Sequence, residues 1–324
     1  MPENVGQFTF ELEDYQQAAR TYRSDYLRMP ILALASALAF MTLRPGVRYQ
    51  EVVESPDIDV ELAPYKRNRI TNSDPIMKQR VLSTFFGSLN YEFEPNKNIS
   101  TLLGHRATQA MGESLATTIQ AHEVLGMVPK AIGRKLLSAL WNAIRDPNGK
   151  KTKDLFDGFD TITDKEIVAG NISATKDNYL LLDEKPDFNN AVDIAQEIMY
   201  HLSPELRQTK CYMFTSQGFI DRYNKAYKRE SGCVPYNTEY DKNVVEGSNG
   251  NLVMVPMIGK ENSSFIHVTT RGNMLVSCDQ LSDNETVRVA NYSPDTIMFM
   301  MRMFFGVDFA TLDPRLFFCA EIPA

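Results

Sequence analysis

The sequence contains little cysteine and no long hydrophobic run. Its four cysteines, Cys211, Cys233, Cys278 and Cys319, show no Cys-x-x-Cys spacing, which argues against a disulfide framework or a zinc knuckle. The one long apolar stretch, Met29 to Met41, is too short to span a bilayer. The acidic first twenty residues lack the positive charge that begins a secretory signal. We therefore expect a reduced protein, made in the cytoplasm, without a membrane segment.

The usual motifs of enzymes and metal sites are also missing. The histidines His105, His122, His201 and His267 share no metal-ligand spacing. Gly149-Lys150 is not preceded by the first glycine of a P-loop, and no Gly-x-Ser-x-Gly elbow occurs. The acidic cluster from Asp154 to Asp164 does not match the calcium loop of an EF-hand. The sequence thus predicts no catalytic residue, no cofactor and no metal site.

Composition indicates an ordinary folded protein with a slight acidic excess. The 324 residues carry 34 basic and 41 acidic side chains, a formal charge of −7, and 43% are hydrophobic. This net charge disfavours binding of nucleic acid through the overall charge of the surface, and it leaves open that a local basic patch binds it. One basic run, Lys66, Arg67 and Arg69 next to Tyr65, stands out. We interpret these four residues as a subunit contact at a loop tip, in preference to a nucleic-acid site.

The first part of the chain reads as an arm. Helical patterns run from Asp14 to Met41 with a break expected at Pro30. Strand-like alternation follows in Asp57–Leu62 and Leu89–Glu94, with a polar stretch between them. A two-stranded arm with so few apolar residues is marginal alone in water, so we expect a partner subunit to cover it.

The remainder predicts an α+β protein. Residues 101–145 have helical spacing, and Pro129 suits the first turn of a second helix. Between residues 187 and 285 helices alternate with strands, including a strand at Lys210–Phe214, a helix capped by Ser216, and a hairpin around Arg271-Gly272-Asn273. The C-terminus predicts a pair of apolar strands, Phe299–Phe309 and Leu316–Ile322, which the helix ending at Arg145 would cover.

The order of these segments resembles the major capsid proteins of tailed bacteriophages and prophages, which share the Hong Kong ninety-seven-type fold. The resemblance is carried by residues 140–159 as the end of a spine helix with its loop, by 191–227 as helix, strand and helix, by Leu252–Pro256, and by Phe305–Phe318. It implies an N-terminal arm (1–45), an extended loop (46–95), a peripheral domain with the spine helix (96–186 and 286–324), and an axial domain (187–285).

The resemblance also implies a role and partners. The chain would self-assemble, as hexamers and pentamers, into the icosahedral shell of a virion, with a scaffold, a portal and double-stranded DNA packaged without sequence specificity. No asparagine lies in Thr296–Met303, where the best-known member accepts a lysine cross-link, so we expect a noncovalent shell. Two alternatives stay open: an encapsulin-like cargo shell, and a soluble oligomeric α+β enzyme that pairs the thiolate of Cys278 or Cys211 with a distant histidine.

Overall fold

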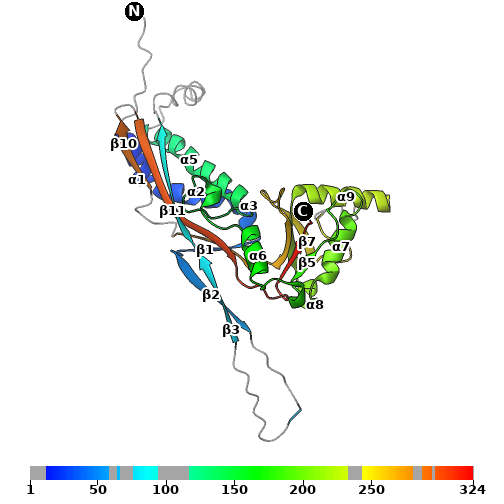
Figure 1. The fold of residues 1–324 in the computed structure, drawn as a ribbon. Coiled ribbons are helices and arrows are strands. Elements are labelled where there is room, and N and C mark those ends of the chain that lie inside the picture. Colours follow the sequence, from blue (N-terminus) through cyan, green and yellow to red (C-terminus); the bar gives the residue numbers. More distant parts are fainter. Residues whose placement is uncertain are drawn as a thin grey trace, which may run out of the picture.

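The computed structural model describes residues 12–57, 64–65, 76–93, 117–232, 243–279, 287–293 and 296–323. Figure 1 shows two sheets, each with helices packed against it, and a long hairpin that leads away from both. This mixture of helices and strands confirms the predicted α+β class. Within the described ranges, no helix has both the length and the apolar character needed to cross a bilayer.

The first sheet is built around its longest strand, β11. Its members are β1 (Thr42–Pro45), β4 (Phe85–Phe93), β9 (Met274–Cys278), β10 (Val287–Ser293) and β11 (Thr296–Phe309). Strand β11 pairs antiparallel with β10, β4 and β9, and β1 runs parallel to β9. The strand predicted at Phe299–Phe309 is therefore confirmed, and so is the part of Leu89–Glu94 that the structure describes, up to Phe93.

Three helices cover one side of this sheet: α1 (Leu12–Thr21), α2 (Arg23–Ala33) and α5 (Thr117–Ala139), followed after α2 by the short α3 (Ala35–Leu38). Leu125 of α5 shares a buried cluster with Phe299 and Met301 of β11. Leu136 and Leu140 join a second cluster with Phe305. The spine helix thus covers the C-terminal strand, as its sequence predicted, because its apolar stripe faces the sheet.

The second sheet has the order β5-β12-β8-β6-β7. Its strands are β5 (Tyr179–Leu181), β6 (Cys211–Thr215), β7 (Leu252–Pro256), β8 (Phe265–Thr270) and β12 (Phe317–Glu321), and its helices are α7 (Ala191–His201), α8 (Pro204–Gln208) and α9 (Gln217–Ser231). The side chain of Ser216 accepts a hydrogen bond from the Phe219 amide at 3.2 Å, so the predicted cap of α9 is confirmed.

The two sheets share one core at the end of α5. Trp141 is fully buried, and its ring centroid lies 5.3 Å from that of Phe159 and 5.7 Å from that of Phe214. Phe159 begins α6 (Phe159–Val168), which follows the 3-10 helix η1 (Thr152–Asp154); a second one, η2 (Ala174–Lys176), precedes β5. Trp141 therefore connects the spine helix, α6 and the second sheet through direct ring contacts.

Several sequence expectations are wrong in detail. Both Pro30 and Pro129 lie inside helices, in α2 and α5, although each lacks the amide that the helix would use there. The two strands expected as a hairpin around Gly272 enter different sheets, since β8 pairs with β6 and β12 while β9 pairs with β1 and β11.

The expected C-terminal strand pair does not form either, because β12 pairs with β8 and β5 instead of β11. Apolar alternation identifies a strand but carries no information about which distant strand becomes its partner.

Candidate assembly surface

The hairpin of β2 (Gln50–Asp57) and β3 (Ile76–Ser83) forms a sheet of its own, projecting from the body in Figure 1. At its base, Val53 and Leu82 are buried against Leu275 of β9. On its other face the cross-strand pair Val52 and Val81 is exposed, at 53% and 48% of the side-chain surface. A two-stranded sheet with an exposed apolar pair has the character of a surface that a second chain covers.

Arg80 of β3 fixes this hairpin to the body. Its Nη2 lies 2.8 Å from Asp308 Oδ1 and 2.9 Å from Glu166 Oε1. Its Nε donates a hydrogen bond of 3.0 Å to the carbonyl oxygen of Phe309. Burial acts to lower the pKa of Arg80, but the two carboxylates outweigh it and raise that pKa, so the guanidinium stays charged. One side chain from the hairpin thus joins β11 and α6.

Of the four predicted contact residues, the structure describes Tyr65. Tyr65 is 91% exposed, which suits a residue that meets another molecule. Lys66, Arg67 and Arg69 lie outside the described residues. The structure therefore tests neither their position nor their contacts.

A groove of about 760 Å³ opens where the hairpin meets the body. Phe85 and Phe86 of β4 and Ile132 of α5 provide apolar lining, and Lys150 and Lys151 line it as well. The guanidinium of Arg145, another lining residue, lies over the Phe85 ring at 4.1 Å from its centroid. The groove is thus apolar in part, and the loop that follows α5 gives it side chains of both charges, including Asp146 and Asp154.

The cysteines named for the enzyme alternative do not have the properties of nucleophiles. Cys211 and Cys278 are buried, and burial raises the pKa of each thiol to about 12. Thiolates are correspondingly disfavoured at neutral pH. Cys319, cross-strand neighbour of His267, is also buried, and its pKa is raised well above the ordinary value by burial. Among the described residues, no cluster of three metal-ligating side chains occurs.

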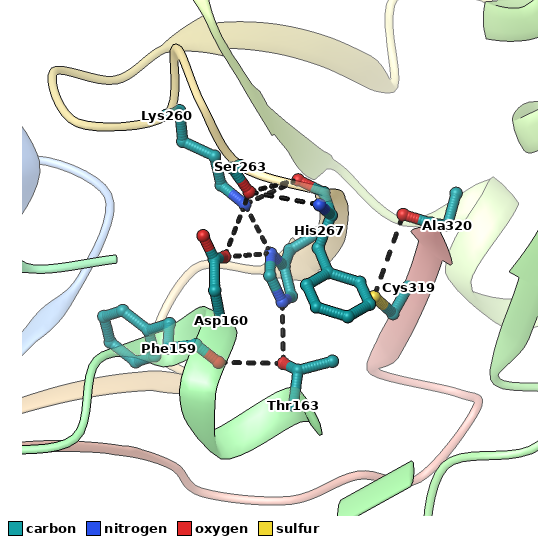
Figure 2. A network of polar contacts seen from close by, with 9 residues as sticks. Phe159, Asp160, Thr163, Lys260, Ser263, His267, Cys319 and Ala320 are labelled. Carbon is teal, nitrogen blue, oxygen red and sulfur yellow. Dashed lines mark hydrogen bonds and ion pairs between the residues drawn. The ribbon is translucent and has the colours of Figure 1, made fainter. Parts of the chain in front are cut away.

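One buried cluster of charged residues does exist, at the junction of the two sheets (Figure 2). The Lys260 ammonium lies 2.9 Å from Asp160 Oδ1, 2.9 Å from His267 Nδ1 and 2.7 Å from the Phe265 carbonyl oxygen. It also lies 4.3 Å from the centroid of the Trp141 ring. Because His267 Nδ1 accepts from the ammonium, Nε2 carries the proton and faces Thr163 Oγ1 at 2.8 Å.

This cluster holds α6 to the second sheet. Burial, followed by the charge of Lys260, lowers the pKa of His267 well below its usual range, so the ring is neutral. Neither Lys260, Asp160 nor His267 lines the groove at the hairpin base. A charge pair enclosed in this way serves structure better than turnover, because a substrate has no access to it.

Sequence reasoning missed both the Arg80 and the Lys260 contacts. Arg80 stands in a strand whose neighbours give no hint of burial, and its partner Asp308 is 228 residues away. Lys260 and Asp160 are separated by 100 residues. One signal was available in the sequence. Asp308 stands among apolar residues near the end of β11, and a charged side chain in such a position needs a partner if it is buried.

Comparisons with known proteins give a likeness of structure and none of sequence. No protein-family model matches the chain, and no curated protein matches it. A satellite phage P4 procapsid protein is similar with a TM-score of 0.55 and 11% identity, covering 98% of this chain and 93% of that one. The capsid of cyanophage A-1(L) is similar with a TM-score of 0.54 and 12% identity, covering 91% of this chain and 92% of that one. The capsid of a native GTA particle has a TM-score of 0.53 and 13% identity, covering 90% of each chain.

These matches extend over nearly the whole length of both partners, so the likeness includes the two sheets, the helices and their connections. At identities of 11–13%, the likeness supports a shared fold, but the roles of individual residues cannot be assigned from these structures. The chain has the α+β capsid fold of tailed-bacteriophage major capsid proteins.

Proposed function

We propose that this chain is the major capsid protein of a tailed bacteriophage or prophage and that it assembles into the icosahedral shell around the genome. The observation that carries the proposal is the likeness to the P4 procapsid protein over 98% of this chain. The hairpin supports it, because its exposed pair Val52 and Val81 has no cover within the described residues of the same subunit. Self-association into hexamers and pentamers would supply that cover.

The division of the chain inferred from the resemblance belongs to this proposal. Residues 1–45 form the N-terminal arm, 46–95 the extended loop, 96–186 and 286–324 the peripheral domain, and 187–285 the axial domain. Strand pairing runs across these ranges: β1, β4 and β9 belong to the first sheet, and β5 and β12 belong to the second. In the shell, Tyr65, Lys66, Arg67 and Arg69 contact a neighbouring subunit.

The chain acts by assembly and not by catalysis. It is made in the bacterial cytoplasm and ends in the virion capsid, where a scaffold, a portal and double-stranded DNA are its further partners. The buried thiols and the enclosed lysine support a structural role. The shell is held by noncovalent contacts, so denatured particles are expected to give a single band at 36.7 kDa, and covalent ladders would contradict this.

Electron microscopy of the purified chain, with light scattering for mass, tests the proposal. Concentrated samples with and without a crowding agent are expected to give closed shells, rings of five or six subunits, or curved sheets. Shells that contain a co-purified enzyme and no nucleic acid after expression with a packaging system would favour a cargo shell. A monomer under every condition, including co-expression with a scaffold protein, would contradict the proposal.

A further inference from the structure

Two segments of the chain contain no acidic residue at all. Although 41 of the 324 residues are Asp or Glu, none lies between Tyr26 and Gln50 or between Val124 and Arg145. The same segments carry seven cations: Arg28, Arg44, Arg48, Lys130, Arg134, Lys135 and Arg145. The chain as a whole has a net charge of −7, so these two segments are positively charged regions in an acidic protein.

The fold places the helical parts of these segments side by side. A Cβ added at Gly133 of α5 would lie 2.5 Å from Ala33 Cβ and 2.8 Å from the Pro30 carbonyl oxygen of α2. Gly126 faces the end of the Met29 side chain, whose Cε would lie 3.3 Å from an added Cβ. Gly133 lets the backbones of α2 and α5 approach closely, so the cations of the two helices belong to one layer.

The cations of this layer point to solvent. Arg28, Lys130, Arg134 and Lys135 are exposed, while the apolar stripe of α5 faces the sheet. Within the ranges that the structure describes, no ion pair involves any of the four. No described carboxylate therefore neutralises their charge by an ion pair.

The loop after α5 adds further cations, next to the acidic Asp146 and Asp154. Lys150 and Lys151 are exposed there and line the groove together with Ile132 of α5. The nearby carboxylate of Asp154 accepts the backbone amides of Lys150 and Lys151 at 3.1 and 2.9 Å. These hydrogen bonds stabilise the loop. Among the described residues, no ion pair involves the ammonium group of Lys150 or Lys151.

We propose that this basic helical face, defined by Arg28, Lys130, Arg134, Lys135, Lys150 and Lys151, binds the phosphate backbone of double-stranded DNA without reading its sequence. Mobile lysine and arginine side chains on a helix and a loop suit phosphates spaced along a duplex. The inference rests on the proposed function and extends it, since it makes the α2–α5 side the inner surface of the shell. The opposite side of the first sheet then faces outward.

A salt titration of DNA binding tests this inference. The probe is a fluorescein-labelled duplex of about 30 base pairs in two unrelated sequences, measured by anisotropy between about 50 and 300 mM salt. The test variant is Lys130→Gln with Arg134→Gln and Lys135→Gln. The control is Lys225→Gln with Lys228→Gln and Arg229→Gln on α9, which changes net charge equally in the other part of the molecule.

The test variant is expected to bind on the order of a hundredfold more weakly at low salt, with a slope of log K against log salt shallower by about 2 to 3. The control keeps the slope of the wild type, and both duplexes bind alike. If the test and control variants lose DNA affinity by the same factor, the inference is overturned. Binding of polyglutamate but not of the duplex would overturn it too, and would assign the face to an acidic scaffold polypeptide.

Electron microscopy of the same three preparations separates the two proposals. If all three proteins form shells and the slope of log K against log salt for DNA binding is the same in each, the inference is wrong and the proposed function stands. Failure of every preparation to form shells or rings would count against the proposed function, whatever the DNA result.

Discussion

Replacing Arg80 with methionine removes the cation that holds the hairpin to the body. The methionine retains most of the apolar stem of the arginine, so the change removes charge and hydrogen bonds with little loss of packing. Asp308 Oδ1 then loses its partner at 2.8 Å and Glu166 Oε1 its partner at 2.9 Å. Asp308 keeps one hydrogen bond, from the Phe309 amide at 2.7 Å.

The expected cost follows from burial. The side chains of Arg80, Asp308 and Glu166 are 17%, 12% and 18% exposed. Breaking a buried pair by removing one partner costs about 3–5 kcal/mol. Because some water still reaches all three groups, we expect the lower end, about 3 kcal/mol of unfolding free energy.

Urea unfolding of the dissociated subunit at neutral pH measures this loss. Arg302→Met is the matched control, since Arg302 is exposed on β11 and the substitution is the same. Adding Asp308→Asn to Arg80→Met removes one of the two carboxylate charges that lose Arg80, the less exposed one, and should restore about 1–2 kcal/mol. Hydrogen exchange is expected to rise in β3 in the single variant and to stay unchanged in the control.

A loss of less than about 0.5 kcal/mol for Arg80→Met, equal to that of the control, would refute the reasoning. It would show that the hairpin base is held by Leu82 and its apolar neighbours alone. A large loss that the second substitution does not reduce would show that the guanidinium, and not the orphaned carboxylate, carries the effect.

Three further predictions concern assembly, pH and helix packing. Val81→Glu should leave unfolding free energy within about 0.5 kcal/mol yet reduce the yield of shells by electron microscopy, whereas Val168→Glu, at an 89% exposed site on α6, should reduce neither. Since the pKa of His267 is lowered in the fold, the unfolded state binds an extra proton below about pH 6.5. Stability is thus present above that pH and lost on acidification by up to about 1.4 kcal/mol per pH unit, a slope that His267→Gln should lack in urea titrations between about pH 5 and 7. Gly133→Ala should lower stability by about 1–3 kcal/mol in thermal or urea unfolding, because its Cβ would lie 2.5 Å from Ala33 Cβ; an unchanged midpoint would contradict the close packing of α2 on α5.

Local features of the fold could be predicted from the sequence because their causes are local. Ser216 caps α9 with an atom three residues from the amide it accepts. The alternation in β11 reports directly which side chains face the helices. The order of such elements was enough to identify the fold.

Features that depend on distant partners could not be predicted. The turn at Gly272 looked like a hairpin, yet the Asn273 side chain donates to Thr269 Oγ1 and accepts from the Thr311 amide, both at 2.8 Å. These bonds hold a turn from which β8 and β9 diverge into separate sheets. The anchor of the hairpin was hidden for the same reason, because no local pattern marks Arg80 as the partner of Asp308.

The pairing of early with late strands also sets an order on folding. Strand β1 needs β9, β4 needs β11, and the Arg80 anchor needs Asp308, 228 residues later. Such contacts close large loops and form slowly. A chain still on the ribosome, or one broken before β11, therefore lacks a fixed hairpin. If the hairpin must be fixed before subunits associate, incomplete chains are kept out of the growing shell by their own topology.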